Sequence, residues 1–170
     1  KIDDKITAYT SIVHVSCGDH HTIAKSATGN VFCWGRNNMG QLGVGDFKNR
    51  DRPTLLELLQ GEDIVTVEAG GNFSAAVPTQ PRPGEKRFPN LYLWGDGSKG
   101  QLGFDRTIRQ LSTPKQLNLK IPPVYTNSTE PRCNGLEVAL GTTHTLVLVH
   151  RNVSKGKKHI VSTLYAAGEG

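Results

Sequence analysis

The chain carries the same ten-residue pattern twice, and this internal repeat limits the folds open to it more than any other feature. Each copy begins with Trp-Gly and ends with Gly-Gln-Leu-Gly, and the copies lie 60 positions apart, at Trp34–Gly43 and Trp94–Gly103. Chance is a poor explanation for six identities in one register. A period of this length indicates a structure built from stacked, equivalent units.

A second pattern precedes each copy and occurs three times, at Val15–Thr22, Val67–Ser74 and Val138–Thr145. The third occurrence runs on to Ala167-Gly168 in place of Trp-Gly, and the sequence stops before a third Gly-Gln-Leu-Gly. We therefore read residues 1–170 as one partial domain. It comprises repeat one (about 12–63), repeat two (about 64–135, with insertions) and an incomplete repeat three (about 136–170).

Short apolar and β-branched segments recur within each repeat, between Gly, Asn and Pro turn signals. The 19 glycines of the chain agree with many tight turns. A helical period occurs only weakly, at Thr54–Leu59. Several strands in about 60 residues predict an all-β propeller blade rather than a helical solenoid. The expected strands are Ile12–Ser16, His21–Lys25, Val31–Trp34, Ile64–Glu68, Ser74–Val77, Leu91–Trp94, Thr145–Val149 and Ser162–Ala166.

The repeat resembles that of the regulator-of-chromosome-condensation family, and the resemblance covers nearly the whole chain. It is carried in repeat one by Val15, Gly18, His21, Thr22, Trp34, Gly35, Asn37, Gly40, Gln41, Leu42, Gly43 and Pro53. It implies a seven-bladed β-propeller, of which this chain holds about two and a half blades. The departures are Phe73 for His, Asp96-Gly97 after the second Trp-Gly, and Ala167 for Trp, which suggest a diverged member.

Two and a half blades cannot close a ring in which each of seven blades takes roughly 50°. An open propeller leaves strand edges exposed, and exposed edges favour aggregation. We therefore expect other segments or other chains to complete the propeller, with this chain being a segment of a longer protein or lying beside further chains.

The recurring residues are expected to be structural rather than catalytic. Gly-Gln-Leu-Gly lacks the Lys and Ser/Thr of a phosphate-binding P-loop. His21 and His144 recur at equivalent positions, so we expect them to pack and hydrogen-bond alike in every blade. This structural set comprises Gly18, His21, Trp34, Gly35, Gly40, Gln41, Leu42, Gly43, Gly70, Trp94, Gly95, Gly100, Gln101, Leu102, Gly103, Gly141 and His144.

No motif for covalent catalysis, a cofactor or a metal is found in the sequence. Asp46 and Asp105 occupy nearly matched positions after the two signature copies, which is typical of a repeated surface turn. The residues Cys17, His20, His21 and Cys33 form the only candidate metal group, and their spacing is unlike that of a zinc site. We therefore expect neither an enzyme nor a cofactor.

Two insertions between the second and third strands are basic, one in Pro78–Asn90 and one in His150–His159. Because equivalent hairpins of neighbouring blades leave on the same face, we expect one positive patch. Two interpretations stay open: solvated loops, or a site for an acidic partner such as DNA, a nucleosome or an acidic protein. The basic residues are Arg82, Lys86, Arg87, Arg151, Lys155, Lys157 and Lys158. A third insertion, around Ile121–Cys133, lies between repeats two and three.

The first functional hypothesis is a protein-interaction scaffold. The resemblance also implies two alternatives: a guanine-nucleotide exchange factor for a Ran-like small GTPase that binds chromatin, and the substrate-recruiting propeller of a ubiquitin ligase. Three cysteines without paired spacing favour a reducing compartment, the nucleus or cytoplasm. No apolar run approaches the roughly 18 residues of a membrane helix, so we expect no membrane association.

Overall fold

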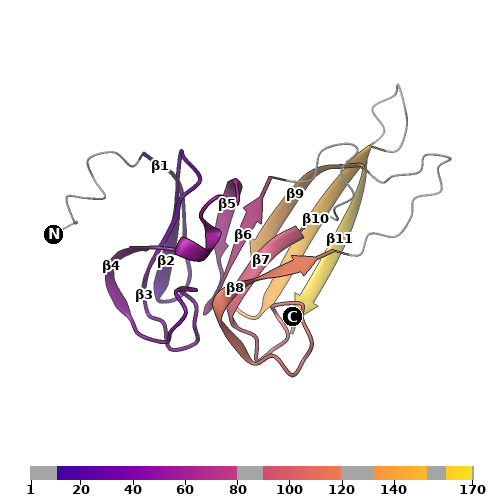
Figure 1. Cartoon of the computed structure of the whole chain (residues 1–170). Helices are drawn as coiled ribbons and strands as arrows, with labels where there is room; N and C mark the ends of the chain where they lie inside the picture. The colour runs from indigo at the N-terminus through magenta and orange to yellow at the C-terminus, as the bar shows by residue number, and fades with distance from the viewer. Residues whose placement is uncertain (1–10, 80–89, 120–131, 153–159, 170) are drawn as a thin grey trace.

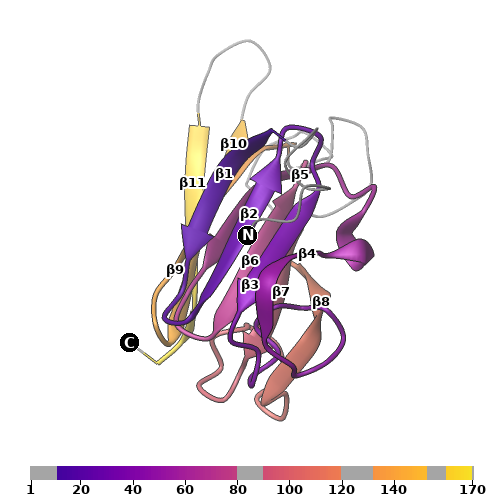
Figure 2. The ribbon, with the colours of Figure 1, turned by 90° about the vertical axis from the view of Figure 1, so that its left-hand side faces the viewer.

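The computed structural model describes residues 11–79, 90–119, 132–152 and 160–169. Within these ranges the chain forms three antiparallel sheets that stand side by side in chain order (Figure 1). Figure 2 looks along this stack, with the first sheet in front. The structure is a partial β-propeller, so the predicted fold class is confirmed.

Each sheet is a meander in which every strand pairs with its neighbour in sequence. The first sheet contains β1 (Ile12–Cys17), β2 (His21–Ser26), β3 (Val31–Gly35) and β4 (Arg50–Leu55). The second contains β5 (Ile64–Ala69), β6 (Phe73–Pro78), β7 (Asn90–Asp96) and β8 (Gln110–Asn118). The third contains β9 (Arg132–Leu140), β10 (His144–Asn152) and β11 (Ile160–Gly168).

The core lies between the sheets, where one sheet packs its face against the next. Successive side chains of a strand point to opposite faces, so the second sheet supplies apolar residues to both of its neighbours. Between the first and second sheets the buried residues include Ile23, Val31 and Leu42 from one side and Val67 and Trp94 from the other. Between the second and third sheets, Phe73 and Leu93 contact the same cluster as Val147 and Val149.

Backbone hydrogen bonds connect the sheets at one end of the stack. The Asp19 amide donates to the Gly71 carbonyl, and the Gly71 amide donates in turn to the Gly141 carbonyl. These bonds fix the sheets in equivalent positions, so corresponding strands of neighbouring sheets begin side by side.

The outer strands β4 and β8 differ from the sequence-based expectation, which placed no strand there. Both are rich in polar residues and contain a proline, and both are mostly half-buried or exposed, so they lack an apolar alternation. The weakly helical segment Thr54–Leu59 divides between the end of β4 and a short 3₁₀-helix, η1 (Glu57–Leu59). Cys133, assigned to an insertion from the sequence, lies in β9.

Candidate functional site

The Gly-Gln-Leu-Gly segment of the first repeat receives side chains from the second sheet. The Gln41 carbonyl accepts hydrogen bonds from the Ser74 hydroxyl at 2.9 Å and from the Trp94 indole at 2.9 Å. Trp94 is fully buried. A side chain at Gly43 would collide with the indole, because a Cβ there would lie 2.7 Å from Trp94 Nε1. The signature residues of one blade thus form the socket for the tryptophan of the next.

His21 belongs to the same interface and is buried. Its Nε2 lies 2.8 Å from the Ser74 hydroxyl, whose single proton is donated to Gln41. Nε2 must therefore carry the ring proton and act as the donor. Burial lowers the pKa of His21 to about 4, and the charge of Asp19 and the Phe73 backbone oppose this shift less strongly. At neutral pH the imidazole is an uncharged, structural donor.

The equivalent positions in the other blades repeat part of this arrangement. The rings of His21, Phe73 and His144 each cover the glycine three residues earlier in the chain, where no Cβ could be accommodated. Thr145 takes the place of Ser74, and its hydroxyl donates to the Gln101 carbonyl at 2.7 Å. These hydroxyls contribute to both interfaces, and sequence reasoning did not single them out as functional groups.

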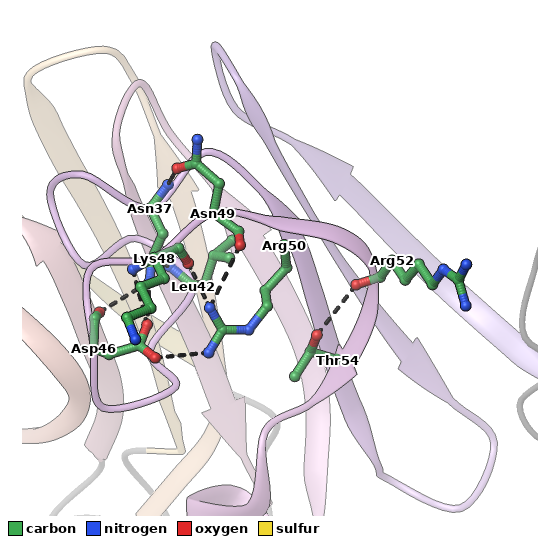
Figure 3. A network of polar contacts seen from close by, with 8 residues as sticks. All are labelled: Asn37, Leu42, Asp46, Lys48, Asn49, Arg50, Arg52 and Thr54. Carbon is green, nitrogen blue, oxygen red and sulfur yellow. Dashed lines mark hydrogen bonds and ion pairs between the residues drawn. The ribbon is translucent and has the colours of Figure 1, made fainter.

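A polar network closes the signature turn of the first repeat (Figure 3). The Asn37 side chain accepts from the Leu42 amide at 2.9 Å and donates to the Asp46 backbone carbonyl at 2.9 Å. Arg50 forms a 2.7 Å ion pair with Asp46 and lowers the pKa of that carboxyl. In the second repeat, the hydrogen bond from the Thr107 amide lowers the pKa of Asp105. Both carboxylates stabilise turns.

No three His, Cys, Asp or Glu side chains gather into a metal-binding group within the described part of the chain. Cys17 is exposed, whereas Cys33 is buried between sheets, and burial raises the pKa of its thiol. A thiol that resists ionisation is a packing group rather than a nucleophile.

The predicted basic patch falls almost wholly outside the described residues. Arg82, Lys86, Arg87, Lys155, Lys157 and Lys158 lie there, and Arg151 lies in β10, paired with Val161. The strands that carry the two insertions are described. Since β6 and β10 begin together at the Gly71–Gly141 bond, their other ends lie at the opposite end of the stack (Figure 1).

Two of the pockets bordered by described residues lie between the second and third sheets. One, of about 240 Å³, is mostly apolar and borders Leu102, Gly103 and Ala167. The other, of about 480 Å³, is polar and borders Arg106 and Arg109, besides the ion pair of Lys99 with Glu169 at 3.0 Å. The replacement of Trp by Ala167 was the one sequence signal that marked this interface.

No helix in the described ranges has the length and apolar character needed to cross a lipid bilayer.

The segments 12–41, 28–77 and 90–148 match family models for the regulator of chromosome condensation (RCC1) repeat. The chain is 31% identical over 144 residues to RCC1 domain-containing protein RUG3, mitochondrial, from Arabidopsis thaliana, covering 83% of this chain and 29% of that protein. It is 38% identical over 99 residues to the human E3 ubiquitin-protein ligase HERC2, covering 58% of this chain and 2% of the ligase.

Solved structures share the fold. Human WBSCR16 matches with a TM-score of 0.63 at 23% identity, over 85% of this chain and 34% of that one. Prp20p from Saccharomyces cerevisiae, described with its binding to Gsp1p and histones, matches with a TM-score of 0.62 at 18% identity, over 96% of this chain and 42% of that one. The chain thus spans under a third of the two curated relatives above. Because the family models match most of its length, the chain belongs to the regulator of chromosome condensation (RCC1) repeat family.

Proposed function

We propose that this chain is part of an interaction scaffold and has no active site of its own. The observation that carries the proposal is that the repeated polar groups of the first interface bond to one another between the sheets. The Gln41 carbonyl, the Ser74 hydroxyl and the His21 imidazole bond to one another in the first interface. Such residues hold blades together, and the connections between strands are then free to vary and to bind partners.

The partner proposed for this scaffold is an acidic protein surface, bound by the two basic insertions. One carries Arg82, Lys86 and Arg87 against Glu85, and the other carries Arg151, Lys155, Lys157 and Lys158 without an acidic residue. The supporting observation is that β6 and β10, which lead into these insertions, occupy equivalent positions in neighbouring sheets. Cations from both would then face the same partner.

The test compares two triple charge reversals with the same change in net charge. Nucleosomes, whose histones present an acidic surface, serve as the probe, and free DNA of the same length separates protein from phosphate recognition. We expect Lys155, Lys157 and Lys158 changed to Glu to weaken nucleosome binding at least about tenfold, because several cation–anion contacts become repulsive. The control changes Arg36, Lys48 and Arg52, which are exposed on the first repeat, to Glu and should alter affinity less than about twofold.

Equal losses in both variants, or none in either, would overturn the basic-insertion site. Binding to free DNA as tight as to nucleosomes would replace the acidic-protein partner with nucleic acid. A steep fall in affinity with salt accompanies either result, so it does not separate them.

The exchange-factor alternative is tested by the release of labelled GDP from a Ran-like GTPase. A scaffold without exchange activity leaves the rate within about twofold of the spontaneous one, whereas acceleration of tenfold or more would establish exchange. The ubiquitin-ligase alternative keeps the scaffold function but places it beside a ligase domain in a longer protein. The nucleus or cytoplasm stays a prediction, which imaging of the tagged protein would check.

A further inference from the structure

Between the second and third sheets, a pocket lies beside the position that is equivalent to Trp94 in the first interface. The cavity holds about 240 Å³ and is lined mostly by apolar residues, among them Leu93, Leu117 and Val147. The signature residues Gln101, Leu102 and Gly103 form one wall, and Ala167 of β11 forms another. The pocket is partly open to solvent rather than enclosed, so a ligand could enter it.

In the first interface, the same space is filled by the indole of Trp94. Trp94 and Ala167 are equivalent, because Trp94 pairs with Ser74 and Ala167 pairs with Thr145. The following glycines also share one backbone conformation, with φ of 100° at Gly95 and 106° at Gly168. The strands therefore follow the same course, and the cavity arises from the missing ring.

Two polar groups at the cavity wall lack the partners of their counterparts. The Gln41 carbonyl accepts two hydrogen bonds, from Ser74 and Trp94, while the Gln101 carbonyl accepts one, from Thr145, among the described residues. Gln101 is fully buried, and its Nε2 has no partner within the described ranges. The carbonyl therefore retains an acceptor position where the first interface places an indole N–H.

The counterpart Gln41 Nε2 donates to Asn72 at 3.2 Å. The residue equivalent to Asn72 is Thr143, whose hydroxyl instead donates to the Glu169 carbonyl at 2.8 Å. The second interface is thus short of one aromatic ring and of one acceptor for Gln101. An indole N–H is a donor only, so the group it can pair with is the Gln101 carbonyl and not the Nε2 donor.

We propose that this cavity binds one indole ring, which lies over Gly103 and donates its N–H to the Gln101 carbonyl. The volume of about 240 Å³ and the mostly apolar lining leave room for a bicyclic ring. The ring can belong to a free indole compound or to a tryptophan side chain of a partner. Both sources share the chemistry of a planar apolar ring with one N–H donor.

The test follows 5-fluoroindole by fluorine NMR in the presence of the purified protein. We expect broadening of its signal with the unchanged protein, and at least tenfold weaker binding with Ala167→Trp, which supplies the ring from the chain itself. Leu58→Trp adds a tryptophan at an exposed site on η1 and is the matched control; it should bind 5-fluoroindole as the unchanged protein does. Benzothiophene has the same shape without the N–H and should compete about fivefold less well than indole.

If Ala167→Trp does not fold, Ala167→Leu replaces it in the test. Its smaller side chain would occupy part of the pocket, so it should also weaken binding of 5-fluoroindole. Competition by free indole alone assigns the site to a small molecule, and stronger competition by a Gly-Trp-Gly peptide assigns it to a partner's side chain. Either result supports the site. Absence of broadening with the unchanged protein, or equal broadening with all folded variants, overturns it.

Discussion

At the scale of single residues, the position three residues after the repeated glycine carries a histidine in the first and third sheets and a phenylalanine in the second. His21, Phe73 and His144 each cover a glycine of their own sheet, yet His21 alone is buried with its ring nitrogen on a hydroxyl of the next sheet. A ring of the right shape is what the position requires, since Phe73 meets the requirement without any polar atom. The imidazole adds a hydrogen bond and, with it, a dependence on pH.

The stability of the chain should fall below neutral pH because of His21. Its pKa is about 4 in the folded chain, against the ordinary histidine value of 6.5. Above pH 6.5 the ring is neutral in both states, and its full contribution is present; as pH falls from 6.5 toward 4, only the unfolded chain takes up the proton. Urea unfolding at pH 7 and pH 4 should therefore show a loss on the order of 2–3 kcal/mol from this group.

His21→Phe is the control for this pH dependence, because Phe73 shows that the position accepts a phenyl ring. The variant should lose less stability than the unchanged chain between the two pH values, by about the same 2–3 kcal/mol. Parallel pH curves for the two proteins would show that the imidazole is not the titrating group.

At the scale of elements, the outer strand of one blade covers the signature turn of the preceding one. Gly40 and Gly100 occupy the same turn, with φ of 79° and 78°. A Cβ at Gly40 would lie 2.6 Å from the Leu111 carbonyl oxygen of β8, whereas a Cβ at Gly100 would meet no atom of the described residues within 4 Å. Equal backbones therefore have unequal surroundings, because β8 lies over the first turn and no described strand lies over the second.

Alanine substitutions at these two glycines should separate backbone strain from steric collision. Gly100→Ala introduces only the left-handed conformation of a non-glycine residue, at a cost of about 1 kcal/mol. Gly40→Ala adds a collision with β8 and should cost a further 1–3 kcal/mol. Thermal or urea unfolding measures both, and equal losses would mean that β8 does not rest on this turn.

At the scale of the whole molecule, the two end faces of the stack repeat the pattern of the inner interfaces without being covered. Ile64 and Val67 are 3% and 0% exposed between sheets, while their equivalents in β1, Ile12 and Val15, are 46% and 57% exposed. On the third sheet, Leu164 is 61% exposed. Exposed apolar residues at positions that are buried between sheets elsewhere in the chain favour association with another apolar sheet face.

The 170-residue chain should therefore self-associate through these faces at micromolar concentrations. Val15→Lys and Leu164→Lys, which place a charge on either end face, should shift it toward the monomer in sedimentation velocity experiments. Leu58→Lys removes an equally exposed leucine from η1, which lies outside the sheets, and should leave association unchanged. A monomeric unchanged chain, or equal effects of all three substitutions, would contradict the prediction.

The sequence was sufficient to predict the fold class and most of the strands, since both depend on local signals. Apolar and β-branched residues mark β1 and β5, and turn residues mark the ends of the strands. The outer strands β4 and β8 were not predicted, because their polar, proline-containing segments form strands only through pairing with β3 and β7. The basic insertions were predicted as a site from charge alone, and their residues stay a prediction.

By itself, the sequence determined which residues recur and therefore which blades the chain builds. The tertiary structure decided what each repeated residue meets, because its neighbours come from another sheet. Trp94 reaches Gln41 across 53 positions of sequence, and no local pattern encodes that contact. The same stacking turns the replacement of a tryptophan by Ala167 into a cavity, since a sheet held in register by its backbone cannot collapse to fill the space of one missing ring.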